Sequence, residues 1–157
     1  SDPIERVGPN EKKLINDLFK TMYDSKGIGL AAVQVGILKR VLVIDVSNKD
    51  EKKKPISLIN PIIKKVSDAT SIYEEGCLSI PDTFIEIERP KICEVEYVDI
   101  NGQKKYLKCD GLLSTCLQHE INHLDGKLII DYLSKLKRDL IIKKISKSKK
   151  NPDRIIV

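Results

Sequence analysis

The chain has 157 residues and a formal net charge of +5, with 41% hydrophobic and 32% charged residues. This length and composition are typical of one globular domain, here residues 1–157, and exclude a disordered chain or a small disulfide-stabilised one. No apolar run approaches the ~20 residues needed to cross a bilayer, and we expect neither a membrane span nor a secretory leader.

The first predicted element is an amphipathic helix that begins at Glu11, after the capping residue Asn10, and ends before Gly27. Its apolar stripe is formed by Leu14, Ile15, Leu18, Phe19 and Met22. The next segment, GIGLAAVQVG (27–36), combines glycines with small residues, so backbone and ligand can approach closely. It is no phosphate loop, because no strand precedes it and G-K-[ST] is missing. Gln34 suggests a wall that hydrogen-bonds a small polar group, and a tightly packed turn is the alternative.

Extended segments dominate the middle of the chain. The predicted strands are 40–46, 57–63, 84–87, 91–100 and 103–109. Pro61 has no amide hydrogen, so we expect the second of these to be an edge strand or an irregular one. Asn101-Gly102 is a strong signal for a two-residue hairpin turn between the last two strands.

A second long helix is predicted after Asp110 and ends at Asp125-Gly126. Its apolar face is formed by Leu112, Leu113, Cys116, Leu117, Ile121 and Leu124. A last amphipathic helix runs from about Ser134 to about Ile145 and continues into a basic tail, which can contact RNA, a ribosome or another anionic surface. A solvated helix face is the alternative for this segment. The order of elements predicts an α+β fold, with antiparallel or mixed β-sheets around the second helix and helices at both ends.

Both histidines of the chain fall in the segment 118–126, QHEINHLDG. His119 and His123 are four residues apart and therefore lie on one helix face, where they can bind one metal ion together. Glu120 is rotated by roughly 100° from His119, so it lies beside the ion and can move a proton of a water molecule. The alternative is that both histidines are ordinary helix residues.

Such a site needs a further protein ligand, and the residues after His123 supply no suitable one. The longer motif H-E-x-x-H-x-x-G-x-x-H fails at Ile129, and no glutamate follows His123. The ligand must then come from upstream, or be an aspartate in an unusual position. Cys77 is the best candidate because it lies in a polar, glycine-containing segment, EEGCLS (74–79), and a thiolate binds a dication well. A buried free thiol is the alternative for Cys77.

The remaining cysteines fit structural roles. Cys93 lies in an alternating strand, Cys109 ends a strand, and Cys116 falls on the apolar face of the second long helix. None of the four cysteines forms a C-x-x-C pair, so we expect free thiols in a reducing compartment.

Three segments together, G-I-G-L-A-A-V-Q (27–34), E-G-C-L-S (75–79) and Q-H-E-I-N-H (118–123), resemble the signature motifs of the peptide deformylase family in order and separation. The resemblance extends over nearly the whole chain. It implies an α+β metallohydrolase that removes the N-formyl group from the N-terminal methionine of newly synthesised proteins. It also implies a location in the bacterial cytoplasm, with an organelle less expected. It also implies that one divalent ion per chain, Fe²⁺ in the cell and Zn²⁺, Ni²⁺ or Co²⁺ in preparations, is bound by Cys77, His119 and His123.

The resemblance implies further roles. A water molecule on the metal attacks the formyl carbonyl, with Glu120 as general base and then general acid. The oxyanion is stabilised by the metal, the backbone N–H of Leu78 and the side-chain amide of Gln34. Glu75 and Arg89 are expected to pair and to support the loop of Cys77.

The substrate peptide is expected to lie extended along the Ile28–Gly29 backbone, with its methionine side chain in an apolar pocket. The residues expected around the substrate are Ile28, Gly29, Tyr73, Gly76, Phe84, Thr115 and Cys116. The basic last helix is expected to dock on the ribosome, and neither DNA nor a membrane is expected as a partner.

Two features depart from the family pattern. Asn122 stands where the family usually has aspartate, and because an amide still accepts a hydrogen bond we expect activity to persist. Ile4 is followed directly by Glu5, whereas family members have several more residues at this place. We expect this difference to affect the first strand and not the site. The alternative function is a metal-stabilised binding module that docks on the ribosome or RNA through its basic tail.

Overall fold

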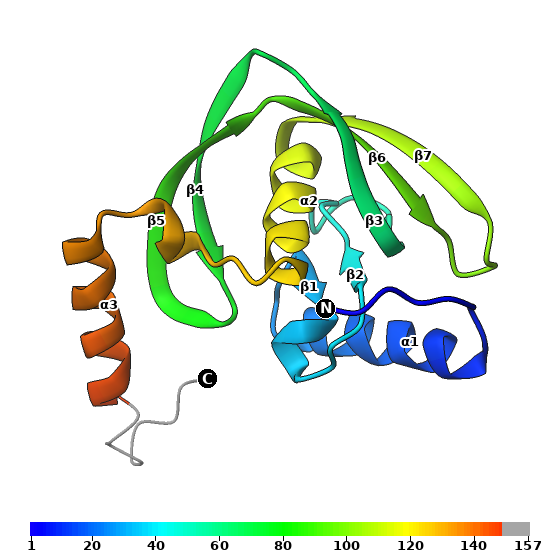
Figure 1. Cartoon of the computed structure of the whole chain (residues 1–157), viewed down its shortest axis with the longest axis horizontal. Coiled ribbons are helices and arrows are strands. Elements are labelled where there is room, and N and C mark those ends of the chain that lie inside the picture. Colours follow the sequence, from blue (N-terminus) through cyan, green and yellow to red (C-terminus); the bar gives the residue numbers. More distant parts are fainter. Residues whose placement is uncertain (149–157) are drawn as a thin grey trace.

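A computed structural model describes residues 1–148, which form three α-helices and seven β-strands. In chain order these are α1 Pro9–Asp24, β1 Gly29–Ala31, β2 Val41–Ile44, β3 Ile56–Val66, β4 Thr70–Cys77, β5 Ile80–Pro90, β6 Ile92–Val98, β7 Lys104–Asp110, α2 Gly111–Leu124 and α3 Lys135–Ser148. Two short 3₁₀ helices span Ala32–Val35 and Ile129–Tyr132. The α+β class is confirmed, and the helix that carries both histidines, α2, lies between two sheets (Figure 1).

Five strands form one antiparallel sheet in the order β1-β2-β3-β6-β7, while β4 and β5 pair as a separate two-stranded sheet (Figure 1). The predicted hairpin of β6 and β7 is present, but its loop spans 99–103 and not two residues. The Asp99 carboxylate accepts hydrogen bonds from the backbone N–H groups of Asn101 and Gln103, both at 2.9 Å. Asp99 therefore organises a longer loop than Asn101-Gly102 alone predicts.

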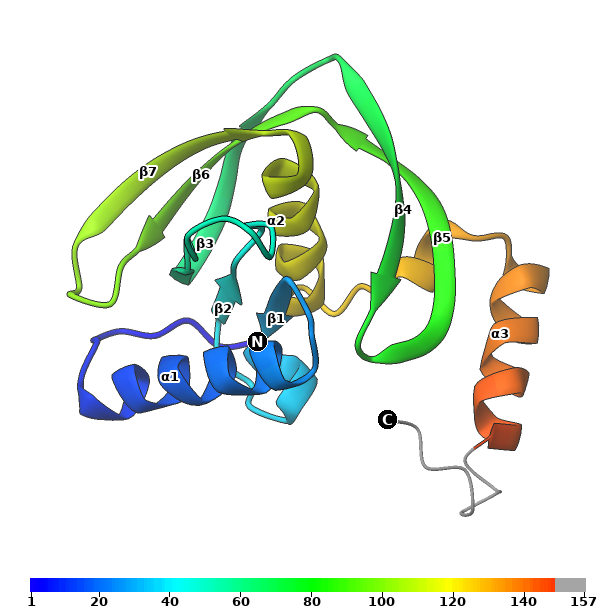
Figure 2. The same ribbon diagram turned by 180° about the vertical axis from the view of Figure 1, so that it is seen from behind.

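The core lies on both faces of the five-stranded sheet. In β2, Val41 and Val43 pack in one apolar cluster with α1, whereas Leu42 and Ile44 pack in another with α2. Because successive side chains of a strand point to opposite faces, α1 and α2 cover opposite sides of this sheet. The sheet thereby fixes the back of α2, and the other side of α2 faces β4 and β5 (Figures 1 and 2).

The predicted start of the first helix was wrong, and one of the two alternatives predicted for the strand around Pro61 is confirmed. Helix α1 begins at Pro9 with Gly8 as its N-cap, so Asn10 lies inside the first turn. Proline suits this first helical position because its missing N–H would be unpaired there in any case. Strand β3 is a central strand and not an edge strand, although it is irregular as expected: its register with β6 shifts around Pro61.

Helix α3 lies beside the two-stranded sheet, at the opposite end of the molecule from α1 (Figures 1 and 2). Ile141 and Ile145 pack against an apolar cluster of β5 and the 3₁₀ helix Ile129–Tyr132, while Leu136 and Leu140 are exposed. At the N-terminal end, Asp2 forms a single parallel bridge with Lys39 in place of a regular strand. Within residues 1–148 no helix has the length and apolar character required to span a membrane.

Candidate metal centre

Helix α2 presents His119 and His123 on one face, one turn apart, as their spacing predicts. Their Nε2 atoms lie 3.0 Å apart and the rings meet edge to face, with centroids 4.7 Å apart. Both residues are buried. Two ring nitrogens directed at one point in a buried place can serve as a pair of metal ligands.

Cys77 reaches the same point from the end of β4, where the chain turns into β5. Its Sγ atom lies 3.2 Å from His123 Nε2. The ligand atoms of Cys77, His119 and His123 all lie within 4.8 Å of one another. One sulfur and two imidazole nitrogens suit a borderline ion such as Fe²⁺, Zn²⁺, Ni²⁺ or Co²⁺, and three protein ligands leave a fourth position open. The residues present therefore fit a catalytic metal ion.

The surroundings of Cys77 and His119 shift the pKa of both side chains. Burial raises the pKa of the Cys77 thiol, but hydrogen bonds with His119 and His123 outweigh burial and lower the pKa to about 5. Burial lowers the pKa of His119, but contacts with Cys77 and Glu75 outweigh this and raise the pKa to about 10. At neutral pH these pKa values make Cys77 a thiolate, the form that binds a metal, and leave a proton on His119 that a metal ion would displace on binding.

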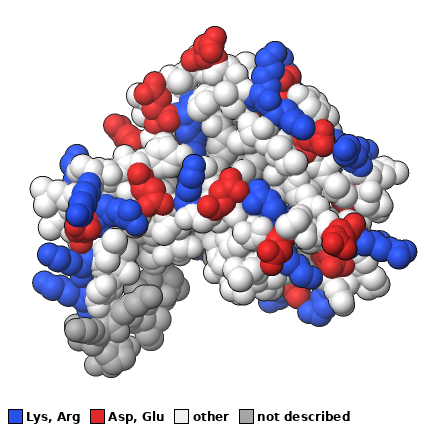
Figure 3. Space-filling view, viewed as in Figure 1, with Lys and Arg blue, Asp and Glu red and all other residues white. Residues whose placement is uncertain are grey.

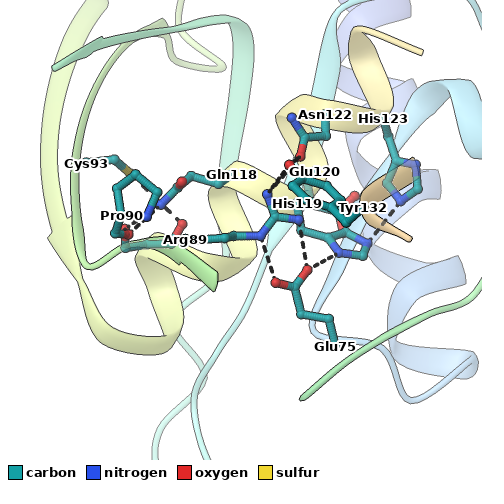
Figure 4. A network of polar contacts seen from close by, with 11 residues as sticks. Glu75, Arg89, Pro90, Cys93, Gln118, His119, Glu120, Asn122, His123 and Tyr132 are labelled. Atoms are coloured by element: carbon teal, nitrogen blue, oxygen red, sulfur yellow. Dashed lines mark hydrogen bonds and ion pairs between the residues drawn. The ribbon is translucent and has the colours of Figure 1, made fainter. Parts of the chain in front are cut away.

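A buried ion pair lies behind His119. Glu75 Oε1 lies 2.9 Å from His119 Nδ1, and Arg89 donates to both carboxylate oxygens of Glu75, at 2.7 and 2.9 Å (Figure 4). Glu75 and Arg89 are 6% and 4% exposed, so this pair is shielded from water. Since the carboxylate holds Nδ1, the ring of His119 keeps its other nitrogen, Nε2, directed at Cys77 and His123.

Asn122 and Tyr132 accept hydrogen bonds from Arg89 on the side of its guanidinium that is away from Glu75. Arg89 Nη1 donates to Asn122 Oδ1 at 2.8 Å and to the Tyr132 hydroxyl at 3.0 Å, and the same hydroxyl donates to Asn122 at 2.8 Å (Figure 4). The sequence marked Asn122 as unusual, but no pattern marked Tyr132. Tyr132 reaches this place because the 3₁₀ helix Ile129–Tyr132 folds back beside α2.

Glu120 lies next to the cluster and is 4% exposed. Its Oε1 atom is 3.9 Å from His119 Nε2, and its Oε2 atom has no hydrogen-bond partner within residues 1–148. Burial raises the pKa of Glu120 to about 7. A buried carboxyl group that titrates near neutral pH can both accept and return a proton.

A cavity of about 770 Å³ opens beside these side chains. Every residue predicted to surround the substrate lines it, together with the predicted oxyanion donors: Ile28, Gly29, Gln34, Tyr73, Gly76, Leu78, Phe84, Thr115 and Cys116. Gly29 is required by close packing, because a Cβ atom there would lie 2.8 Å from Glu120 Oε1 and 2.9 Å from Cys116 Sγ. Leu112 and Ile80 also line the cavity and were not predicted.

Gln34 is held by its own turn and directed at the cluster. Its Oε1 accepts from the Ala31 N–H at 2.9 Å, and its Nε2 donates to Ser79 Oγ at 2.9 Å and lies 3.6 Å from Cys77 Sγ. Because the oxygen is fixed in this way, the N–H₂ group faces the site, where it donates to Ser79 and Cys77. Ser79 was not predicted to take part, although it belongs to the E-G-C-L-S segment.

Comparison with known proteins agrees with this geometry. The model of the polypeptide deformylase family matches residues 1–139. A peptide deformylase of Pelagibacter ubique (strain HTCC1062) is 59% identical over 157 residues, which are 100% of this chain and 90% of the relative. A crystal structure of peptide deformylase from Ehrlichia chaffeensis in complex with actinonin superposes with a TM-score of 0.91 and 43% identity, over 96% of this chain and 90% of that one. The chain belongs to the peptide deformylase family, whose members hydrolyse the N-formyl group of N-terminal methionine in a metal-dependent reaction.

Proposed function

We propose that this chain deformylates nascent peptides with Cys77, His119 and His123 as the ligands of one divalent ion and Glu120 as the proton carrier. One observation carries this assignment: three ligand atoms within 4.8 Å of one another lie beside a buried carboxyl group with an unpartnered oxygen. When bound, the ion supplies a Lewis acid that makes a water molecule nucleophilic at neutral pH and polarises the formyl carbonyl. We propose Fe²⁺ as the native ion on the basis of the resemblance to the peptide deformylase family, and the sulfur and nitrogen donors are compatible with it.

Glu120 serves both halves of the reaction in this proposal. Its carboxylate accepts a proton as the water oxygen forms a bond to the formyl carbon. It then gives this proton to the departing amine as the carbon–nitrogen bond breaks, so the products are formate and a free N-terminus. A pKa of about 7 suits both directions of transfer.

Gln34 and Leu78 are proposed to stabilise the oxyanion. Gln34 and Leu78 line the same cavity as Glu120. Donors that are held in place before the reaction stabilise developing charge without rearrangement. The hydrogen bond from Ala31 to Gln34 supports this role, because it restricts the amide to one orientation.

The substrate is proposed to bind as an additional strand. Strand β1 pairs only with β2 in the described part of the sheet, so backbone groups of Ile28 and Gly29 can pair with an extended peptide along the cavity. Thr115 and Cys116 from α2, with Tyr73 and Phe84 from the two-stranded sheet, are proposed to surround the methionine side chain. Gly76 lets Phe84 approach, since a Cβ atom at Gly76 would lie 2.8 Å from the Phe84 ring.

Formate release tests this function directly. Protein purified without oxygen and loaded with Fe²⁺ or Ni²⁺ is expected to release formate from formyl-Met-Ala-Ser, and not acetate from acetyl-Met-Ala-Ser. Lack of formate with either metal would overturn the proposal, and cleavage of unformylated Met-Ala-Ser would indicate a peptidase instead. Metal analysis of the same preparation identifies the native ion.

A binding module stabilised by a structural metal is not favoured. A structural site is closed by four protein ligands, whereas the cluster found among residues 1–148 contains three.

We also propose that α3 brings the enzyme to the ribosome in the bacterial cytoplasm. Lysines and arginines gather on this helix (Figure 3), and exposed Leu136 and Leu140 interrupt them. Such a surface can contact phosphate groups and apolar protein at once. Changing both of the exposed residues Lys137 and Lys144 to Glu is expected to weaken co-sedimentation with ribosomes, because the change reverses their charge. The helix itself is expected to stay in place, because Ile141 and Ile145 still anchor it. Unchanged co-sedimentation at low salt would reject this contact.

A further inference from the structure

A continuous series of hydrogen bonds connects the half-exposed Tyr132 with the buried ring of His119. It passes from the Tyr132 hydroxyl to Asn122 and Arg89, from Arg89 to Glu75, and from Glu75 to His119 Nδ1 (Figure 4). All of its distances lie between 2.7 and 3.0 Å. These distances are those of well-formed hydrogen bonds.

The guanidinium of Arg89 is the centre of this series. Figure 4 shows it between Glu75 and Asn122, so opposite sides of one planar group are held by different partners. Nε and Nη2 donate to Glu75, and Nη1 donates to Asn122 and Tyr132. Because the guanidinium is rigid and planar, fixing Nη1 also fixes the two nitrogens that hold Glu75.

Glu75 is the one charged partner that Arg89 has among residues 1–148. The side chain of Arg89 is 4% exposed. A buried guanidinium with unsatisfied N–H groups is strongly destabilised, so Nη1 needs the neutral acceptors that Asn122 and Tyr132 provide. The ring of Tyr132 adds a further contact, with its centroid 5.0 Å from Arg89 Cζ.

From this arrangement we propose that Tyr132 is a positioning residue of the metal centre. Its hydroxyl holds Asn122 and Arg89 together, which fixes Glu75 and thereby the tautomer and orientation of His119. Tyr132 is neither among the residues that line the cavity nor in the cluster of three ligands, so it is proposed to act on how firmly His119 holds the ion. This inference rests on the proposed role of His119 as a metal ligand.

Tyr132→Phe isolates the hydroxyl, because it removes both hydrogen bonds and keeps the ring beside Arg89. We expect transfer of the metal to a chelator to become about three- to tenfold faster, since partners of ligating histidines typically change metal affinity 10–100-fold and Tyr132 is one step further away. We also expect the visible absorption bands of the Co²⁺-loaded protein to shift, and kcat to fall with little change in KM. Metal release and the Co²⁺ spectrum do not depend on turnover.

Tyr23→Phe is the matched control. It also removes a tyrosine hydrogen bond, to Asp45 Oδ2 at 2.6 Å, but on α1 at the other face of the five-stranded sheet. We expect Tyr23→Phe to lower thermal stability and to leave metal release and the Co²⁺ spectrum unchanged. Equal acceleration of metal release in both variants would indicate general destabilisation and would overturn the inference.

A double-mutant cycle with Asn122 tests the proposed route. If Tyr132 acts through Asn122 and Arg89, Tyr132→Phe is expected to change metal release less in an Asn122→Ala background than in the unaltered chain. Asn122→Asp keeps an acceptor for both donors and is expected to retain the metal at least as long as the unaltered chain. Additive effects of the two truncations would reject the route.

Failure of this inference differs from failure of the metal site itself. If Cys77→Ala leaves the metal content unchanged, the ligand assignment is wrong and the inference falls with it. If Cys77→Ala loses the metal while Tyr132→Phe releases it at the rate of the unaltered chain with an unchanged Co²⁺ spectrum, the metal site stands and the role of Tyr132 is rejected.

Discussion

His119 and His123 place their Nε2 atoms 3.0 Å apart on successive turns of α2, while Nδ1 of His119 is held by Glu75 on the opposite side of its ring. The ring of His119 is therefore fixed at both ends, and Cys77 completes the cluster from a different element. Two ligands come from a helix that is packed against the sheet, and the third comes from the end of a strand. This division determines which substitutions affect metal binding and which affect catalysis alone.

Cys77→Ala is expected to lose most of the bound metal, because two histidines alone give too few protein ligands for a tight site. Metal analysis after anaerobic gel filtration measures the loss. Cys93→Ala is the control, since Cys93 is buried in the core between the sheet and α2. It is expected to lower stability and to keep a full complement of metal, and full metal content in Cys77→Ala would contradict our ligand assignment.

Glu120→Gln is expected to keep the metal and lose activity. Glutamine has the same shape as glutamate but cannot accept the proton of the attacking water, and a general base contributes about 10²–10⁴-fold to the rate. Formate release and metal content measured on one sample separate the two effects. Activity within tenfold of the unaltered chain would show that another group carries the proton.

Gly29→Ala is expected to lower activity about tenfold to a hundredfold, because the new Cβ would lie 2.8 Å from Glu120 Oε1 and displace the carboxylate. Gly8→Ala is the control: a Cβ there would meet Glu11 Oε2 at 3.4 Å, and Gly8 lies at the start of α1. It is expected to lower stability by roughly 0.5–1 kcal/mol, because alanine is a poorer N-cap than glycine, and to leave formate release unchanged. Normal activity in Gly29→Ala would mean that Glu120 tolerates displacement.

The half-buried Tyr23 and the buried Asp45 form a pair that makes stability depend on pH at both extremes. Burial raises the pKa of Asp45, but hydrogen bonds from Ser47 and Tyr23 outweigh burial, and the net pKa is lowered. Burial, assisted by Asp45, raises the pKa of Tyr23 from 10.0 to about 12. The contribution of Asp45 is present above its ordinary pKa and is lost as the pH falls through its lowered value, whereas that of Tyr23 is present below pH 10 and is lost as the pH rises toward 12.

Thermal melting as a function of pH measures both effects. Tyr23→Phe is expected to remove the part of the alkaline loss between pH 10 and 12 that belongs to this pair. Asp45→Asn is expected to flatten the acid limb below the ordinary pKa of aspartate. Melting curves of Tyr23→Phe that run parallel to those of the unaltered chain above pH 10 would contradict the coupling.

The helices and the β6–β7 hairpin could be predicted because their apolar residues repeat at the period of the element. Strand β4 could not, because the buried residue in its middle is Glu75, a charged side chain whose burial depends on Arg89 from the neighbouring strand. Strand β1 has only three residues, too few for any period to be recognised. Pro61 indicated an edge strand or an irregular one, and β3 is the irregular alternative, because a shift of register lets a central strand hold the proline.

The histidine pair was predictable from local spacing, which left Cys77 as the best candidate for the missing ligand, and the full set of three ligands was implied by the resemblance to the family motifs. The contacts behind the cluster were not predictable in the same way. Tyr132 meets Arg89 through a 3₁₀ turn that returns the chain to α2, and no repeating pattern in the sequence encodes such a return. Residues that support the metal ligands without binding the metal are brought there by tertiary packing, which a single sequence shows poorly.

The metal ligands also come from two parts of the fold, the two-stranded sheet and α2, whose apolar residues belong to different clusters. Cys77 and His123 are 46 residues apart in sequence, one in the two-stranded sheet and one in α2. A bound ion therefore acts as a reversible crosslink between them, and the chain-entropy estimate for a crosslink over a loop of this size is about 4 kcal/mol. Removal of the ion is accordingly expected to loosen the boundary between β4 and α2, and this boundary forms one wall of the substrate cavity. Metal occupancy would then regulate the shape of the cleft as well as its chemistry.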